Sequence, residues 1–497
     1  MNTTTTEKLA QRRVDDRGWR PRNCVWELTL ACNLRCEHCG SRAGRARPEE
    51  LGTDECLSIV SQLADLGCEL VTLSGGEPTL RKDWDVIARA VAGRGIYVNV
   101  VTNGVYRSDE AAREIAARAR DAGLANVGVS LDGPEDVHDR LRGPGTFART
   151  IAAIGHFRAA GLPVAVLTTV NRRNLVLLPE VRRIVMEAGA GQWRLQLAKP
   201  MGTMDEHRDI VIRPEQLLTL IPMLARLKKA GGVHLHVGDS IGYYGPHDKV
   251  LRGVGWRGRK ECWKGCQAGM QAIGIEADGG VKGCLSLQAK WGDRDPFVEG
   301  NLKERTLADV WYDPRSFSFN RDFTEDALTG VCAGCPKGGL CRGGARCVSS
   351  AVSGLLTEDP YCYYRLAGEA ERPISLGLGR AAVAAATLAL SLGAAGCASS
   401  RSNGGGGDED AATAEDSGQV GEDGSVNADY GVDPEPDSGV DASAQPEYGI
   451  KPGPDAGEDA SVQAEYGIKP QLDAGDECAN VCCECDYGDP PPPECCQ

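Results

Sequence analysis

Residues 25–39, Val-Trp-Glu-Leu-Thr-Leu-Ala-Cys-Asn-Leu-Arg-Cys-Glu-His-Cys, join a short apolar run to three closely spaced cysteines. The run from 25 to 30 has the length and composition of a buried strand. The cysteines that follow, Cys32, Cys36 and Cys39, then lie on one short loop at the end of that strand. Three thiolates can hold three irons of a 4Fe–4S cube and leave the fourth iron open. Zinc would favour four protein ligands in paired C-x2-C units.

Outward from this loop, short β-rich runs alternate with amphipathic helical stretches as far as about residue 227. Six strand–helix units in series predict an α/β fold with a parallel sheet, either curved as a partial barrel or doubly wound. Ligands of both architectures bind at the carboxyl ends of the strands. The expected strands are 25–30, 70–74, 97–102, 126–130, 163–170 and 192–197, and the expected helices are 54–66, 83–92, 109–122, 147–160, 178–188 and 214–229. Helix C-caps are expected at Gly67, Gly93, Gly95, Gly123, Gly161 and Gly189.

A second motif, Ser74-Gly75-Gly76-Glu77-Pro78, follows the second expected strand. Glycines let the backbone approach a neighbour closely, and a carboxylate can pair with an ammonium group. Together with the C-x3-C-x2-C loop, this motif resembles the radical S-adenosyl-L-methionine (SAM) superfamily over residues 24–362. The resemblance implies a partial (β/α)6 barrel. It also implies an enzyme that reductively cleaves SAM to a 5′-deoxyadenosyl radical.

The resemblance also assigns SAM contacts, of which the amino and carboxylate groups chelate the open iron. Some of these residues have an alternative interpretation without a role in SAM binding: the Asp132-Gly133 pair is a common turn, and Arg142 could be a surface charge. The implied contacts are Gly75, Gly76 and Glu77 with the methionine amino group, Ser130 and Arg142 with the ribose and carboxylate side, and His38 and Leu197 with the adenine. Cys24, Cys56 and Cys68 have no partner at ligand spacing and are expected to be ordinary thiols.

A cysteine-rich stretch follows the alternating region, from about residue 236 to 366, and resembles the SPASM extension with two auxiliary 4Fe–4S clusters. In relatives, three residues usually separate the third cysteine of the C-x2-C-x5-C run from the next cysteine, but five separate Cys341 from Cys347 here, so Cys347 is the least secure ligand. A disulfide-bonded or zinc-ribbon module is the alternative. The resemblance implies Cys262, Cys266, Cys284 and Cys347 for the first cluster and Cys332, Cys335, Cys341 and Cys362 for the second. Leu285 stands where sulfatase-maturing relatives carry an Asp, which argues against that activity.

The C-terminal part is different in charge. From residue 398 onward, 24 acidic residues face Arg401, Lys451 and Lys469, whereas the whole chain has a net charge of −15, so the preceding body is slightly basic. Such an acidic run favours a disordered, solvated tail and argues against nucleic-acid binding. Tyr430, Tyr448 and Tyr466 recur 18 residues apart, each opening a Tyr-Gly-(Val/Ile)-x-Pro unit.

A segment that resembles a signal sequence precedes the tail. Arg380 is followed by sixteen uncharged residues and then Cys397, and residues 394–397 resemble a lipobox. This arrangement resembles the radical SAM/lipoprotein systems, in which a maturase is paired with a small lipoprotein bearing Tyr-Gly-x-x-Pro motifs. We therefore expect membrane attachment or export of the tail through 381–397 and a cytoplasmic enzyme domain.

The sequence thus predicts an N-terminal extension (1–22), a radical SAM barrel (23–235), a SPASM-like domain (236–366), the lipobox-like segment (373–397) and the acidic tail (398–497). The expected activity is radical modification of a peptide, either the chain's own tail or a separate precursor. The electron donor is expected to be a flavodoxin or ferredoxin. Two alternatives stand beside it: a radical SAM step in cofactor or haem-type biosynthesis on a small molecule, and a membrane-tethered iron–sulfur electron-transfer protein.

Overall fold

The computed structural model describes residues 19–238, 240–253, 263–288 and 295–370, and all of these belong to one compact unit. Cys262, the lipobox-like segment and the tyrosine repeats lie outside the described residues. Within them, no helix is long and apolar enough to cross a membrane.

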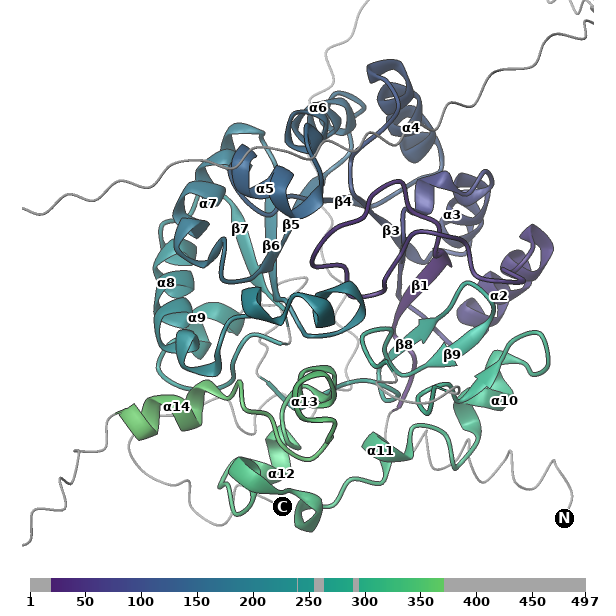
Figure 1. Cartoon of the computed structure of the whole chain (residues 1–497). Helices are drawn as coiled ribbons and strands as arrows, with labels where there is room; N and C mark the ends of the chain where they lie inside the picture. Colours follow the sequence, from purple (N-terminus) through teal and green to yellow (C-terminus); the bar gives the residue numbers. More distant parts are fainter. Residues whose placement is uncertain (1–18, 239, 254–262, 289–294, 371–497) are drawn as a thin grey trace, which may run out of the picture. The chain divides into compact units, whose positions relative to one another are not determined.

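A single ten-stranded sheet forms the body of the molecule, in the order β10-β9-β8-β1-β2-β3-β4-β5-β6-β7 (Figure 1). Strands β1 to β7 are mutually parallel and follow one another in chain order. A doubly wound sheet would reverse its order at a switch point, so the sheet is a partial barrel. The strands are β1 Asn23–Thr29, β2 Leu70–Gly75, β3 Tyr97–Thr102, β4 Asn126–Ser130, β5 Val164–Val170, β6 Gln192–Leu197, β7 His234–Val237, β8 Ala272–Ile275, β9 Gly280–Lys282 and β10 Gly300–Asn301.

Helices run along the outer side of the curved sheet (Figure 1). In α2, the buried residues Cys56, Ile59, Val60 and Leu63 recur at helical spacing, and this stripe is what packs the helix on the sheet. The barrel helices are α2 Thr53–Asp65, α3 Trp84–Gly93, α4 Asp109–Asp121, α5 Glu135–Arg142, α6 Thr146–Ala159, α7 Leu178–Glu187 and α8 Leu217–Lys229. The later helices are α9 Asp248–Arg252, α10 Leu307–Tyr312, α11 Ser318–Arg321, α12 Gly338–Cys341, α13 Arg346–Ser353 and α14 Tyr363–Ala370.

The six expected strand–helix units are confirmed, with ends that differ by at most two residues except at the last helix. That helix begins at Leu217, because residues Pro214–Gln216 form a separate 3-10 turn. Most expected glycine caps adopt positive φ, but the cap after α3 is Gly95 (φ 74°), whereas Gly93 is the last helical residue. The prediction of a cap at Gly93 was therefore wrong.

Two barrel elements were not predicted, α5 and β7. Helix α5 is strongly charged and buries only His138 and Leu141, so its sequence has too narrow an apolar face to stand out. Strand β7 is short, lies at the sheet edge and contains His234 and His236, which break the apolar pattern.

The cysteine-rich region continues the barrel sheet. Strand β8 pairs in parallel with β1, from Asn23 opposite Ala272 to Trp26 opposite Ile275, and β9 and β10 add antiparallel strands beyond it. Cys24, Cys56 and Cys68 are buried thiols of the barrel core, as expected.

Candidate functional site

The three cysteines of the C-x3-C-x2-C loop lie directly beyond the carboxyl end of β1. The double glycine after β2 packs against the start of this loop. A Cβ on Gly75 would overlap the Thr29 carbonyl oxygen, and one on Gly76 would overlap the Ala31 carbonyl oxygen. The absence of a side chain on these glycines therefore lets their backbone pack closely against the backbone that leads into Cys32.

Glu77 fixes the same region from within. Its carboxylate is 1% exposed and accepts hydrogen bonds from the hydroxyls of Thr79 (2.6 Å) and Thr102 (2.9 Å) and from the Asn103 amide (2.8 Å). Burial raises the pKa of this carboxyl above its usual range, while these hydrogen bonds oppose the rise. The amide side chain of Asn103 lies 3.9 Å from the Sγ of Cys32. Glu77 thus ties the ends of β2 and β3 to the cysteine loop.

The three loop thiols lie within electrostatic reach of one another. Burial raises the pKa of Cys36 to about 11, and the thiols of Cys39 and Cys32 add to this, whereas the Arg142 guanidinium lowers it. No three His, Cys, Asp or Glu side chains among the described residues lie close enough together to hold one metal ion. A 4Fe–4S cube makes a different demand, because each thiolate binds its own iron.

A buried charged group lies beside Cys36. Asp132, just beyond β4, is 0% exposed, and one of its oxygens is 2.6 Å from Nε of Arg142 and 2.9 Å from Nε2 of His38. The two partners hold the pKa of Asp132 well below its usual range in spite of its burial. The structure thus brings His38 and Arg142 together near the loop. Ser130 ends β4, two residues before Asp132.

Leu197 is buried at the end of β6, and its amide donates to the hydroxyl of Ser240 (3.2 Å). The chain beyond it reaches the cysteine loop, since the Thr203 amide donates to the Cys39 carbonyl oxygen (2.8 Å). Within the described part of the chain, Leu197 makes no hydrogen bond or ion pair with His38 or Arg142; it shares with Ser130 a position at the carboxyl end of a strand.

The later cysteines fall into two groups. Cys266, Cys284 and Cys347 form the first: burial, with contributions from the thiols of Cys347 and Cys284, raises the pKa of Cys266 to about 12. The ammonium of Lys199 lies 3.4 Å from the Sγ of Cys347; burial raises the pKa of Cys284, and the Lys199 charge opposes this rise. Sequence reasoning missed Lys199, for which the available signal was its position two residues beyond a strand end.

The second group holds Cys332, Cys335, Cys341 and Cys362. Burial raises the pKa of Cys362 to about 12, with contributions from Cys341 and Cys332, and Cys335 raises the pKa of Cys332. The Trp263 indole donates to the Sγ of Cys341 (3.3 Å). The resemblance implied the same two sets together with Cys262, and that ligand assignment stays a prediction.

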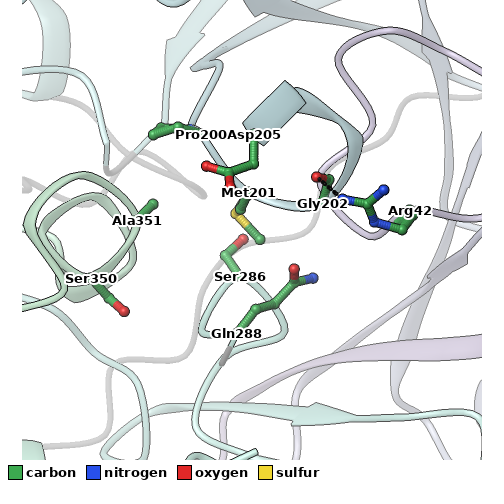
Figure 2. A pocket seen from close by; sticks show the side chains of 9 residues that line it. All are labelled: Arg42, Pro200, Met201, Gly202, Asp205, Ser286, Gln288, Ser350 and Ala351. Atoms are coloured by element: carbon green, nitrogen blue, oxygen red, sulfur yellow. Dashed lines mark hydrogen bonds between the residues drawn. The ribbon is translucent and has the colours of Figure 1, made fainter. Parts of the chain in front are cut away.

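A polar pocket of about 210 Å³ opens between the loop that follows Cys39 and the segments that follow Cys284 and Cys347 (Figure 2). Figure 2 shows the side chains of Met201, Asp205 and Ser286 gathered at its centre, with Ser350 presented by α13. Arg42, at its rim, donates to the Gly202 carbonyl oxygen (2.9 Å) and pairs with Glu206. The lining residues are Arg42, Pro200, Met201, Gly202, Asp205, Ser286, Gln288, Ser350 and Ala351.

Comparison with known proteins places this site in a family. Residues 26–181 match the radical SAM superfamily, and residues 266–336 match an iron–sulfur cluster-binding domain, SPASM. An AdoMet-dependent heme synthase of Methanosarcina barkeri is 31% identical over 354 residues, which cover 69% of this chain and 97% of that protein. This chain belongs to the radical SAM superfamily.

Other proteins with similar sequences are named as a maturase and as a peptide cyclase. The mycofactocin maturase of Mycobacterium tuberculosis is 31% identical over 345 residues (68% of this chain, 82% of that one). The PqqA peptide cyclase of Rhizobium meliloti is 26% identical over 370 residues (73% and 92%). Among solved structures, Streptococcus suis SuiB bound to S-adenosylmethionine has a TM-score of 0.54 at 17% identity and covers 71% of this chain and 79% of that one, a similarity of fold.

The superfamily implies 4Fe–4S clusters and SAM, and the residues present fit both. Three thiols share one loop at the carboxyl end of β1, and the buried Nδ1 of His38 has no protein partner, so a bound molecule could satisfy it. The second cysteine group has the four thiols of a fully ligated cube, and the first has three within the described residues. A reduced cluster with bound SAM supplies a radical that can abstract a hydrogen atom.

The protein's own groups provide the surroundings for this chemistry. Glu77 and the double glycine hold the loop against β2 and β3, and Arg142 places a positive charge beside Cys36. The pocket is lined by residues that follow Cys39, Cys284 and Cys347 in the chain.

Proposed function

We propose that this radical SAM enzyme modifies a peptide, one residue of which enters the pocket between the SAM loop and the auxiliary thiols. The observation that carries the proposal is the position and lining of that pocket. The hydroxyls of Ser286 and Ser350 and the amide of Gln288 can pair with peptide N–H and C=O groups. Arg42 lies at its rim with a 59% exposed side chain.

The pocket volume favours a single side chain over a macrocycle. A cavity of about 150 Å³ holds one benzene ring, so a pocket of about 210 Å³ has room for one aromatic residue. Pockets for drug-sized ligands are larger, about 300–1,000 Å³. The peptide-directed names of the maturase and cyclase relatives support the same choice.

We propose the ligands as follows. Cys32, Cys36 and Cys39 hold the SAM-binding cluster, and the two later groups hold one auxiliary cluster each, with Cys262 completing the first. The grouping of Cys347 with Cys266 and Cys284 supports its assignment in spite of the longer spacing from Cys341. Gly75, Gly76, Glu77, Ser130, Arg142, His38 and Leu197 are proposed to surround SAM.

We further propose that the chain's own tyrosine repeats are the substrate. An aromatic residue recurring every 18 residues in a segment with no apolar pattern has no packing role to explain it. The tether raises the effective concentration of the repeats at the pocket. A lipobox at residues 394–397 would let the finished tail be released and anchored, with the enzyme domain in the cytoplasm.

A haem-type step on a small molecule is the second candidate. It is favoured by the heme synthase of Methanosarcina barkeri, which this chain matches over 97% of its length. The substrate would then be a tetrapyrrole and the tail would have no part in the reaction.

One experiment separates the candidates. The full chain, reconstituted without oxygen, is given SAM, dithionite and either a peptide spanning residues 441–475 or an iron tetrapyrrole. We expect 5′-deoxyadenosine formation to rise with the peptide, whose mass falls by about two units per crosslink. Stimulation by the tetrapyrrole alone would contradict the proposal.

A pocket variant supplies the control. Gln288→Trp fills the pocket and should abolish peptide modification while leaving SAM cleavage without peptide intact. Val176→Trp, at a site 70% exposed on the barrel surface, should change neither. Equal modification by both variants would remove the pocket from the proposal.

A further inference from the structure

The carboxylate of Asp132 joins three parts of the barrel. Its Oδ2 accepts from Nε of Arg142 on α5 (2.6 Å) and lies 2.9 Å from Nε2 of His38 on the cysteine loop. Its Oδ1 accepts from the Thr169 amide of β5 (2.8 Å). Through one side chain, the end of β4 is therefore connected to α5, to β5 and to the cysteine loop.

The two partners of the Asp132 Oδ2, His38 and Arg142, both lie beside the cysteine loop. His38 lies between Cys36 and Cys39 in the sequence, and the Arg142 guanidinium interacts electrostatically with both of these thiols. Because His38 and Arg142 contact the same oxygen, a shift of either one changes the position available to the other. The Oδ2 of Asp132 thus helps to fix the positions of the Arg142 guanidinium and the His38 imidazole beside the loop.

The main-chain groups of Asp132 have hydrogen-bond partners of their own, separate from those of its carboxylate. The Asp132 amide donates to Nδ1 of His138 (3.2 Å), and Asn174 donates to the Asp132 carbonyl oxygen (2.8 Å), so its main-chain groups are also paired. The Nε of Arg142 is engaged by Asp132, which leaves the four other N–H donors of its guanidinium for further partners. A buried ion pair adds little stability by itself compared with apolar packing, so a gain in stability does not by itself account for the buried Asp132–Arg142 pair.

We propose that Asp132 is a positioning residue for SAM: it holds Arg142 and His38 in the geometry that binds SAM and makes no contact with SAM itself. Arg142 would meet an anionic group of SAM with its free donors. His38 would meet a polar group with its unpaired Nδ1. The proposal concerns SAM alone and does not depend on the identity of the substrate.

The test uses the full chain with Asp132→Asn, reconstituted without oxygen. We expect the iron content to be unchanged. The Kd for SAM should rise by about 10–100-fold, the range typical when a group that orients a ligand-binding residue is lost. At a SAM concentration that just saturates the wild type, the change that SAM causes in the electron paramagnetic resonance spectrum of the reduced cluster should be smaller in the variant.

A matched variant controls for the loss of an ion pair as such. Asp85 of α3 pairs with Arg118 of α4 at 2.6 Å, away from the cysteine loop, and Asp85→Asn should leave the SAM Kd and the spectrum unchanged. Wild-type SAM binding and a wild-type spectrum in Asp132→Asn would overturn the proposal. So would equal losses in the two variants.

A second variant keeps the proposal testable if Asp132→Asn does not fold. Arg142→Lys retains a positive charge for Asp132, but its single ammonium cannot serve Asp132 and a second partner in the way a planar guanidinium can. We expect the same loss of SAM affinity in folded, iron-replete protein. Wild-type affinity in Arg142→Lys would overturn the proposal.

Discussion

The Nζ of Lys199 lies 3.4 Å from the Sγ of Cys347, and it joins the segment beyond β6 to the first auxiliary group of thiols. A positive charge at this distance stabilises the more negative, reduced state of any cluster held there. Its neighbour in the chain, Pro200, lines the pocket, so the same segment contacts both the substrate space and the auxiliary thiols.

Lys199→Met should therefore lower the midpoint potential of one auxiliary cluster, by on the order of 50 mV, which corresponds to about 1 kcal/mol for a one-electron couple. Lys199→Arg keeps the charge and should retain the wild-type potential within experimental error. A potentiometric titration followed by electron paramagnetic resonance would measure this. Identical potentials for Lys199→Met and the wild type would contradict the expectation.

Replacement of Cys32, Cys36 and Cys39 by alanine should abolish SAM cleavage and leave the auxiliary clusters in place. Iron should fall from about twelve to about eight atoms per chain, because each cube holds four. Iron analysis together with assay of 5′-deoxyadenosine would check both points. Continued SAM cleavage by the triple variant would reject the assignment of the loop.

Cys347→Ala tests the least regular of the spacings. We expect it to remove or convert one auxiliary cluster and leave the SAM-binding cluster and SAM cleavage unchanged, since Cys347 groups with Cys266 and Cys284. Cys56→Ala is the control, because Cys56 is a buried thiol of the α2 packing stripe and should retain all iron. If Cys347→Ala also retains all iron, Cys347 is not a ligand.

His138 should make stability depend on pH. Burial, helped by the Arg142 charge, lowers the pKa of His138 to about 4, below its ordinary value of 6.5. Between these values the unfolded chain binds the proton and the folded protein does not, so stability is lost as the pH falls from about 6.5 to 4. The full loss is roughly 3 kcal/mol.

His138→Asn should flatten that dependence, because asparagine can still accept from the Asp132 amide but does not titrate. Urea midpoints of the reconstituted protein at pH 7 and pH 5 would measure it. His207→Asn, at a half-exposed position on a 3-10 turn, serves as the comparison. A wild-type pH dependence in His138→Asn would show that another group is responsible.

The barrel was predictable because its helices and strands have strong periodic patterns and capping glycines. Strands β3, β4 and β6 match their predicted ranges residue for residue. Helix α5 was not predictable in this way, since its stability depends on contacts made in the folded barrel, among them Arg142 with Asp132. A residue assigned to SAM by resemblance thus lies on a helix that the periodicity does not reveal.

The site was predictable as a set of motifs but not as a set of contacts. The cysteine spacing and the family resemblance predicted the cluster sites and their ligand sets, but not the neighbours of the thiols, such as Lys199 beside Cys347. The carboxylate of Glu77 was expected to face a ligand, and in the structure it accepts hydrogen bonds from Thr79, Thr102 and Asn103. Two of these partners, Thr102 and Asn103, lie more than 20 residues from Glu77 in the chain, so no local sequence pattern indicates them.

Strand β1 pairs with β2 on one side and with β8 on the other. Cys32 follows β1 by three residues, and Cys284 follows β9, the neighbour of β8, by two. The SAM loop and the first auxiliary group are therefore attached to one hydrogen-bonded sheet, with β8 lying between their two strands. A change in the pairing of β1 with β8 would shift these two cysteine groups relative to each other, whereas a lengthened surface loop would leave both in place.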